Sequence, residues 1–232
     1  MPAYRAVLFD FFGTLTRAVR RGPAHAGIAR MLGCDPATMV DVLDRSYHAR
    51  ARGMFGSAED TLRWVAAEAG AHPGDPALRA AVDARREAIH ADTTLRPEAV
   101  PTLRALRRRG LRTAVVSDCT HELPDVLPRL PVNRLLDARV LSVELGVCKP
   151  DPGMFLCAAA LVGARPEECL YVGDGGSREL SGAEAVGMTA VRLRAPDLAG
   201  HLTFNPDTTW TGPDITGLED TIALVDRVLE PA

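Results

Sequence analysis

The chain has 232 residues, of which 47% are hydrophobic and 25% charged, and its formal net charge is −3. This composition supports a packed core large enough for one domain, or for a core domain with a smaller companion, and it excludes a disordered chain. The weak negative charge gives no electrostatic basis for binding nucleic acid or an anionic membrane.

Short apolar runs that end in small or acidic residues recur along the chain and alternate with helical patterns. In chain order they are AVLFD, which ends at Asp10, RTAVVSD, which ends at Ser117 and Asp118, ARVLS near Val140, CLYVGD, which ends at Asp174, and MTAVRL. Runs of this length predict parallel strands that are buried on both faces. The tail after the last run predicts a loop, a short strand and a closing helix.

Between about residues 17 and 95 the strand-like runs disappear, and Ala, Arg, Leu and Glu dominate. The segments PATMVDVLDRSYHARARGMF, SAEDTLRWVAAEAG and DPALRAAVDARREAIHA predict helices. In the rest of the chain, PEAVPTLRALRRRG, DPGMFLCAAALVG and SRELSGAEAVG predict helices that each end at a glycine. We therefore expect an α/β core of residues 1–16 and 96–232, with an all-helical cap of residues 17–95 inserted after the first strand.

Polar side chains stand where three of the predicted strands end. In an open parallel sheet, ligands bind beyond the carboxyl ends of the strands, so we expect Asp10, Ser117 and Asp174 to converge. Lys149, the only lysine among 27 basic residues, precedes a proline-started helix and is expected at the same rim. A carboxylate, a hydroxyl, an ammonium group and an acidic loop suit phosphoryl transfer, which depends on positioning and charge neutralisation.

Four motifs then occur in a fixed order: FDFFGTLT, VVSDC, GVCKPDPGMF and YVGDGGSRELSGAEAVGM. Together they resemble the motifs of the haloacid dehalogenase superfamily, in the subgroup with a helical (C1-type) cap after the first strand. The resemblance covers the whole core, whereas the cap resembles the family only in position and helical character. It implies a Rossmann-like, doubly wound parallel sheet and a hydrolase.

The resemblance also implies a role for each matching residue. Asp10 is then the nucleophile that attacks phosphorus, and Ser117, followed by Asp118, holds the substrate's phosphoryl oxygens. Lys149 neutralises charge on the nucleophile and the phosphate.

A magnesium ion is implied in the same way. Its ligands are Asp10, the backbone carbonyl of Phe12 and Asp174. Glu179 stands where the family usually has a second acid of the fourth motif, and it would bind the metal through water.

Phe12 departs from the family's phosphatases, which normally have a second Asp two positions after the nucleophile. That Asp protonates the leaving group and then activates water, and a phenyl ring does neither. Positioned acid–base catalysis typically contributes ~10²–10⁴-fold, so its loss affects both half-reactions. The predicted metal site is unaffected, because position 12 contributes only its backbone carbonyl.

Three interpretations remain open. The first is a phosphatase of small phosphomonoesters whose proton comes from water, the substrate or a cap residue. The second is a metal-independent 2-haloacid dehalogenase, since that subgroup resembles FDFFGTLT in having an aromatic at this position and halide leaves without a proton. Those enzymes lack the metal-binding Gly-Asp, however, whereas Gly173-Asp174 and Glu179 favour metal and phosphate. The third is a catalytically weak regulatory module that binds a phosphate ligand.

A phosphonoacetaldehyde hydrolase is excluded, because its Schiff base needs a cap lysine and this cap has none. A replacement acid from the cap would most naturally be His48. For each candidate, a role on the surface or in packing is the commoner alternative. The candidates are Tyr47, His48, Arg50, Arg52, Arg17, Arg20, Arg21 and, behind the second motif, His121.

Five cysteines without CxxC spacing favour neither a disulfide framework nor a zinc site and suit a reducing compartment. No apolar run reaches the length of a membrane span. We expect a cytoplasmic protein, a monomer or homodimer, whose partner is a small, phosphorylated substrate rather than nucleic acid or membrane.

Overall fold

The computed structural model describes residues 4–229, and a sheet of six parallel strands lies at its centre. The strand order is β3-β2-β1-β4-β5-β6, with β1 between β2 and β4. The strands are β1 (Ala6–Phe9), β2 (Arg112–Ser117), β3 (Ala138–Leu141), β4 (Cys169–Gly173), β5 (Thr189–Leu193) and β6 (Asp214–Ile215). The predicted α/β class and doubly wound sheet are confirmed.

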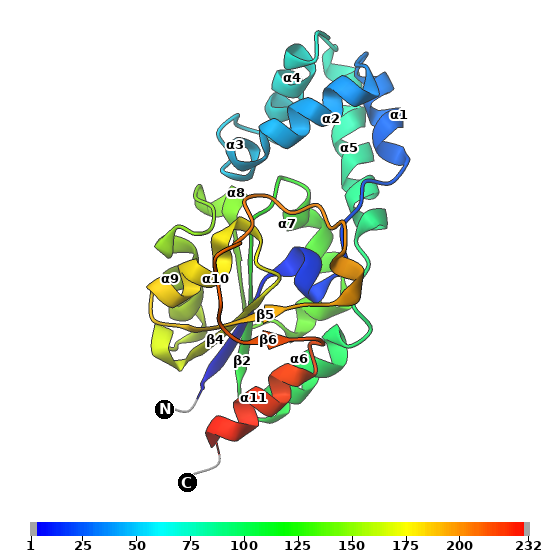
Figure 1. The fold of residues 1–232 in the computed structure, drawn as a ribbon. Helices are drawn as coiled ribbons and strands as arrows, with labels where there is room; N and C mark the ends of the chain where they lie inside the picture. The colour runs from blue at the N-terminus through cyan, green and yellow to red at the C-terminus, as the bar shows by residue number, and fades with distance from the viewer. Residues whose placement is uncertain (1–3, 230–232) are drawn as a thin grey trace.

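Helices cover both faces of the sheet (Figure 1). One face packs against α6 (Ala99–Arg108), α7 (Leu123–Val126) and α11 (Asp220–Leu229). The other packs against α9 (Pro152–Val162) and α10 (Glu179–Ala185), and the short α8 (Ser142–Leu145) follows β3. Because both faces are covered, every residue of β1 and β4 is buried, as their continuous apolar runs predict.

Five further helices gather beyond the carboxyl ends of the strands (Figure 1). They are α1 (Ala24–Met31), α2 (Pro36–Arg45), α3 (Tyr47–Ala51), α4 (Ala58–Glu68) and α5 (Asp75–Asp92). Apolar residues of α1, α2, α4 and α5 form a separate cluster, so this cap has its own small core. An antiparallel bridge between Thr16 and Leu95 pairs the outgoing and returning chain at its base. The exact boundaries of a separate domain stay a prediction.

The predicted helical segment 36–55 is interrupted at Ser46. The Ser46 hydroxyl donates to the carbonyl of Val42 at 2.6 Å, and its backbone leaves the helical region between α2 and α3. A serine that bonds back to the preceding turn competes with the helical pattern, which explains the break. Helix α1 was not predicted, because its eight residues carry too short an apolar pattern.

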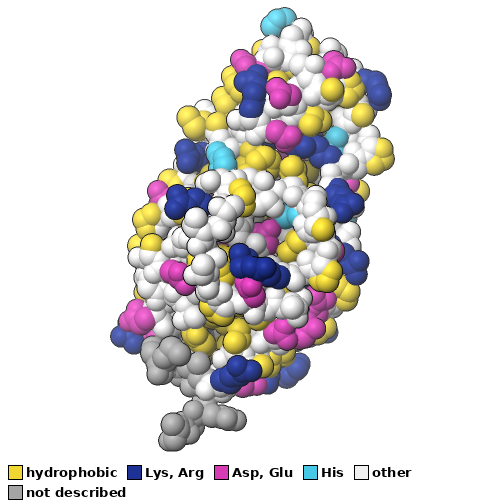
Figure 2. Space-filling model, in the orientation of Figure 1, with side chains coloured by type: hydrophobic (Ala, Val, Ile, Leu, Met, Phe, Trp, Pro, Cys, Tyr) yellow, Lys and Arg dark blue, Asp and Glu magenta, His cyan; other side chains and the backbone are white. Residues whose placement is uncertain are grey.

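No helix within residues 4–229 combines the length and apolar character needed to cross a bilayer. On the face shown in Figure 2, arginines and carboxylates are intermixed over both the cap and the core. This distribution agrees with the weak net charge of the sequence.

A buried ion pair joins the cap to the core. Arg85 Nε of α5 donates to Glu122 Oε1 at 2.6 Å, and the two side chains are only 6% and 12% exposed. Burial alone would raise the pKa of Glu122, but the charge of Arg85 and the hydrogen bonds from Thr120 and Arg85 outweigh it and lower that pKa to about 2.

This lowered pKa predicts acid sensitivity. The pair's stabilisation is complete above the ordinary glutamate pKa of 4.5 and is lost as pH falls through about 2. A shift of this size corresponds to about 3 kcal/mol. Urea unfolding at pH 7 and pH 3 is expected to show a stability advantage of the native protein over Glu122→Gln that shrinks at the lower pH. An advantage that is the same at both pH values would contradict the prediction.

Candidate active site

The strand ends place the predicted polar residues at one edge of the sheet. Asp10 follows β1, Ser117 ends β2, and Asp174 follows β4. Because β1 pairs with both β2 and β4, the carboxyl ends of these three strands are neighbours. The topology therefore brings together residues that are more than 50 positions apart in the chain.

Lys149 lies at the centre of this group and is 4% exposed. Its ammonium donates to Asp10 Oδ1 at 2.7 Å, to Glu179 Oε2 at 2.5 Å and to the Val116 carbonyl at 3.3 Å. Burial opposes its charge, but the carboxylates of Asp10 and Glu179 outweigh burial and hold the pKa of Lys149 well above its ordinary value. The only lysine of the chain is thus a buried, charged group beside Asp10.

Glu179 is fully buried, and both of its carboxylate oxygens have partners. Oε2 accepts from Lys149 and from the Tyr171 hydroxyl at 2.8 Å, and Oε1 accepts from the Gly175 N–H at 3.0 Å. A Cβ on Gly173 would lie 2.1 Å from Glu179 Oε1, so only glycine at the end of β4 admits this carboxylate. In this structure Glu179 is above all the partner of Lys149.

Asp10, Asp174 and Glu179 form the acidic cluster of the site. One oxygen from each lies within 4.8 Å of the other two. Asp10 Oδ2 is buried without a hydrogen-bond partner, and burial together with the Asp10 charge raises the pKa of Asp174. Burial and the Asp10 charge also raise the pKa of Glu179, well above its ordinary value. With all three carboxylates ionised against one ammonium the formal charge would be −2, so the donor set fits a hard divalent cation.

The second motif lies against this cluster through its aspartate. Asp118 Oδ1 accepts from the backbone N–H of Lys149 at 2.9 Å. Asp118 lines a cavity of about 50 Å³ at the strand ends, together with Asp10, Lys149, Asp174 and Glu179, and we call this space the catalytic cavity. Ser117 is fully buried, and its hydroxyl donates to the Asp118 carbonyl at 3.3 Å. The structure thus places Asp118 at the cavity, whereas Ser117 does not line it, and the predicted substrate contacts of both stay predictions.

Aromatic side chains form the wall of this cavity toward the cap. Phe12 lines it, and its ring meets Phe11 edge to face at 4.9 Å. The Tyr47 hydroxyl of α3 donates to the Asp118 carbonyl at 2.9 Å, and the Tyr47 ring stacks on Phe204 at 3.9 Å. Cap and core therefore meet through aromatic side chains, and one of them, Phe12, stands where the family's phosphatases normally have a second Asp.

His201 is a site residue that no sequence motif indicated. Its Nδ1 accepts from the backbone N–H of Val19 at 2.9 Å, so a neutral ring carries its proton on Nε2, which lies 3.4 Å from Asp174 Oδ2. A Cβ on Gly13, at φ +86°, would lie 2.6 Å from His201 Nε2, so glycine is required for this approach. His201 belongs to the loop between β5 and β6, whose sequence gives no signal of its tertiary position.

Ser177 was also missed by the sequence analysis. It is buried, it lines the catalytic cavity, and its backbone has a left-handed φ of 52°. Of the predicted alternative acids, His48 does not line the catalytic cavity, and His121 lines a neighbouring cavity under the cap. Among residues 4–229, His201 is therefore the histidine of the catalytic cavity.

A doubly wound sheet with a buried lysine among strand-end carboxylates, under a helical cap, defines a hydrolase of the haloacid dehalogenase type. Residues 4–187 match the family model described as haloacid dehalogenase-like hydrolase, and the chain belongs to that family. The predicted family and the prediction of a hydrolase are confirmed.

Curated relatives with two different activities resemble this chain. An (S)-2-haloacid dehalogenase of Pseudomonas sp. is 31% identical over 111 residues, which are 47% of this chain and 48% of that protein. A glyceraldehyde 3-phosphate phosphatase of Methanopyrus kandleri is 37% identical over 126 residues, which are 54% of each chain. The chain spans about half the length, or less, of most of the curated relatives it matches.

Solved structures match over nearly the whole chain. A 2-haloacid dehalogenase of Pseudomonas syringae has a TM-score of 0.68 at 21% identity and covers 97% of this chain and 99% of its own. A phosphatase of the same superfamily from Thermococcus onnurineus has a TM-score of 0.63 at 20% identity and covers 95% and 97%. At these identities the likeness concerns the fold, and the two names do not decide between dephosphorylation and dehalogenation.

Proposed function

We propose that the protein is a Mg²⁺-dependent phosphatase that hydrolyses a small phosphomonoester through an aspartyl phosphate (an acyl phosphate) on Asp10. The observation that carries this proposal is the acidic cluster: its formal charge of −2 and the unpartnered Asp10 Oδ2 call for a cation. A dehalogenase needs no metal, so a built cation site favours phosphoryl transfer.

The chain's own residues supply positioning and charge. The ammonium of Lys149 holds Asp10 Oδ1 and keeps the carboxylate oriented toward the cavity. Its positive charge also balances the negative oxygens of a phosphoryl group, which is the main requirement of this reaction. Attack by the Asp10 carboxylate forms the bond to phosphorus as the alkoxide leaves, and water later cleaves the acyl phosphate.

Asp10, Asp174 and the backbone carbonyl of Phe12 would hold the magnesium ion, and Glu179 would contact it through water. When bound, the ion would screen charge on the phosphoryl oxygens. Because both oxygens of Glu179 already accept hydrogen bonds, we assign it the task of fixing Lys149.

Dehalogenation of a 2-haloacid is the second candidate, and Phe12 is the observation that favours it. A halide leaves without a proton, so the aromatic residue in place of an acid costs that reaction nothing. Retained phosphate binding without turnover is the third outcome that the fold permits.

Metal removal distinguishes these candidates. Hydrolysis of 4-nitrophenyl phosphate is expected with Mg²⁺ and is expected to fall to background with EDTA, and to return when Mg²⁺ is restored. Chloride release from 2-chloropropionate is measured in parallel. Chloride release that is unaffected by EDTA, without phosphate release, would establish the dehalogenase instead, and binding of inorganic phosphate without either product would establish a binding module.

Replacing Phe12 by aspartate is expected to raise the phosphatase rate by at least about 10-fold. The new carboxyl group stands two residues after Asp10 and supplies the missing proton transfer, which typically contributes ~10²–10⁴-fold in an optimised site. The measurement is kcat on an alkyl phosphate, whose poor leaving group needs a proton.

Phe12→Asn is the matched control, because it has the same size as aspartate but does not transfer a proton at neutral pH. Both variants lose the contact between the Phe11 and Phe12 rings. An equal change in kcat for the two variants would show that the residue at position 12 affects kcat through packing and not through proton transfer.

A further inference from the structure

A second cavity of about 120 Å³ lies between the cap and the core, next to the catalytic cavity. The two cavities share the side chains Phe12, Tyr47, Leu202 and Phe204 as their common wall. The two cavities are therefore adjacent, and a substrate that reaches from Asp10 into the second cavity would have to pass this wall.

Arg50 of α3 faces this cavity as a buried cation without a carboxylate partner. It is 5% exposed, and its Nε and Nη2 donate to Ser46 Oγ at 3.1 Å and to the Leu43 carbonyl at 2.7 Å. Within residues 4–229 no carboxylate forms an ion pair with its guanidinium, and Nη1 makes no hydrogen bond. Burial, followed by the charge of Arg85, lowers the pKa of Arg50 to about 10.

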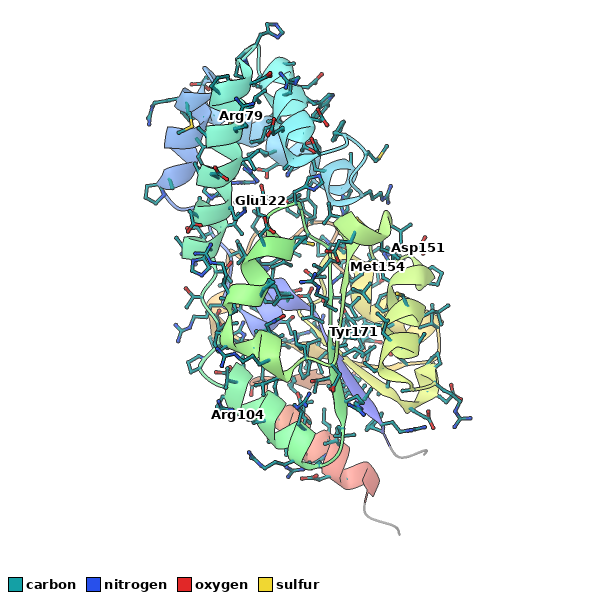
Figure 3. All side chains as sticks on the ribbon, turned by 180° about the vertical axis from the view of Figure 1, so that it is seen from behind. Arg79, Arg104, Glu122, Asp151, Met154 and Tyr171 are labelled. Atoms are coloured by element: carbon teal, nitrogen blue, oxygen red, sulfur yellow. The ribbon has the colours of Figure 1, made fainter. Side chains whose placement is uncertain are left out.

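Arg85 lines the same cavity from α5 and is also 5% exposed. Only its Nε is engaged, by Glu122, so its two terminal amino groups make no hydrogen bond in the described part of the chain. Figure 3 shows Glu122 where the cap meets the core. Two guanidinium groups thus share one neighbouring carboxylate and keep free donors at the cavity.

The other charged groups of the cavity compensate one another. Arg21 pairs with Asp44, and His25 Nε2 lies 2.9 Å from Asp92 Oδ2. Burial lowers the pKa of His25, so this ring is neutral at pH 7. Together with Asp44, which pairs with Arg21, three carboxylates face the three arginines of the lining, so the lining is neutral as a whole and Arg50 is the arginine that has no carboxylate partner among the described residues. Buried charge of this kind is costly unless a ligand of opposite sign pairs with it.

We propose that this cavity binds a carboxylate on the organic part of the substrate, through Arg50 and the free amino groups of Arg85. The proposal rests on the proposed phosphatase function and names its substrate class: phosphomonoesters whose carbon chain ends in a carboxylate. A single negative charge matches the one guanidinium without a carboxylate partner among the described residues, that of Arg50, whereas a second phosphate dianion would exceed it. The side chains of Leu43, Ile89 and Leu123 line the cavity and match the intervening carbon atoms.

The kinetic test compares matched substrates. Native protein with Mg²⁺ is assayed on 4-phosphonooxybutanoate, on butyl phosphate and on butane-1,4-diyl bisphosphate, with the six-carbon analogues as a second chain length. We expect kcat/KM to favour a carboxylate substrate over the matching alkyl phosphate by about 10- to 100-fold, the range of a buried, charge-assisted contact. A ratio near one at both lengths, or a preference for the bisphosphate, would overturn the proposal.

Arg50→Met is expected to abolish this preference through KM, and Arg50→Lys is expected to restore part of it. The matched control is Arg79→Met, because Arg79 is an exposed cap arginine near the far end of α5 (Figure 3). A preference that persists in Arg50→Met, or that is lost equally in Arg79→Met, would contradict the assignment. If Arg50→Met does not fold, the substrate ratio of the native protein and the Arg50→Lys variant still decide.

A binding measurement separates failure of this proposal from failure of the phosphatase function. Ligand-observed NMR is used to compare butanoate with butan-1-ol on native protein, Arg50→Lys and Arg50→Met. Butanoate binding that needs the cation at position 50, in a protein that hydrolyses no phosphomonoester, would retain the carboxylate site and reject the phosphatase. Phosphomonoester hydrolysis without a carboxylate preference and without butanoate binding would do the reverse.

Discussion

Asp10→Asn is expected to lower kcat/KM for phosphomonoester hydrolysis by about 10³-fold or more. The amide has the size of the carboxylate but is a poor nucleophile, so the covalent step is lost while the packing around β1 is kept. It also removes the negative charge that Lys149 contacts at 2.7 Å, and with it one of the three acids of the cluster. The measurement is steady-state hydrolysis of 4-nitrophenyl phosphate with saturating Mg²⁺.

The covalent step is checked directly by acid quenching during turnover. Native protein is expected to carry a phosphoryl group on the peptide that contains Asp10, and Asp10→Asn is expected to carry none. Asp41→Asn is the matched control, because the Asp41 side chain is 78% exposed on α2 and pairs only with Arg45. Undiminished hydrolysis by Asp10→Asn, or a phosphoryl group on another residue, would reject Asp10 as the nucleophile.

The sheet could be predicted from the sequence because parallel strands that are buried on both faces consist of continuous apolar runs. Their apolar runs mark the strands, and the rule that ligands bind at strand carboxyl ends then places Asp10 and Asp174 near each other. Lys149 was accessible for a different reason: a single lysine among 26 arginines is visible in the sequence itself. The structure adds that its ammonium reaches both Asp10 and Glu179.

The residues that the sequence did not reveal are held by contacts distant in the chain. His201 reaches the site because the backbone of Val19, 182 positions earlier, donates to its ring. Arg50 was among the cap candidates of the sequence analysis but Arg85 was not, because arginine is common in this cap and the cavity between the two depends on how α3 and α5 pack over the core. Periodicity and motif spacing describe local order, so they carry no information about such pairs.

Phe12 could be recognised as unusual from the sequence, but its place in the site could be seen only in the structure. The sequence identified it as the departure from the family's phosphatases, and the structure shows why the site tolerates it: its ring belongs to the wall shared by the two cavities. A wall of Phe12, Tyr47 and Phe204 separates the carboxylates of the catalytic cavity from the arginines of the cap. Position 12 therefore contributes to the boundary between the chemistry and the substrate's organic part.

Lys149→Met is expected to lower kcat/KM by about 10²–10³-fold and to destabilise the fold by about 3–5 kcal/mol. The first effect follows from loss of the charge that faces the phosphoryl group. The second follows because removal of one partner leaves Asp10 and Glu179 buried without their counter-charge. Methionine keeps most of the side-chain volume, so the change tests charge rather than packing. Activity and the free energy of urea unfolding are measured on the same preparations.

A double variant separates the two effects. Glu179→Gln keeps an oxygen and an amide beside the Tyr171 hydroxyl and the Gly175 N–H but removes the buried negative charge. Added to Lys149→Met, it is expected to recover about half or more of the lost stability, because the uncompensated charge at position 179 is gone. Hydrolysis is expected to stay low, since nothing then balances the phosphoryl oxygens. Recovery of activity together with stability would show that Lys149 serves the fold alone, and no recovery of stability would show that Glu179 and Lys149 are not energetically coupled.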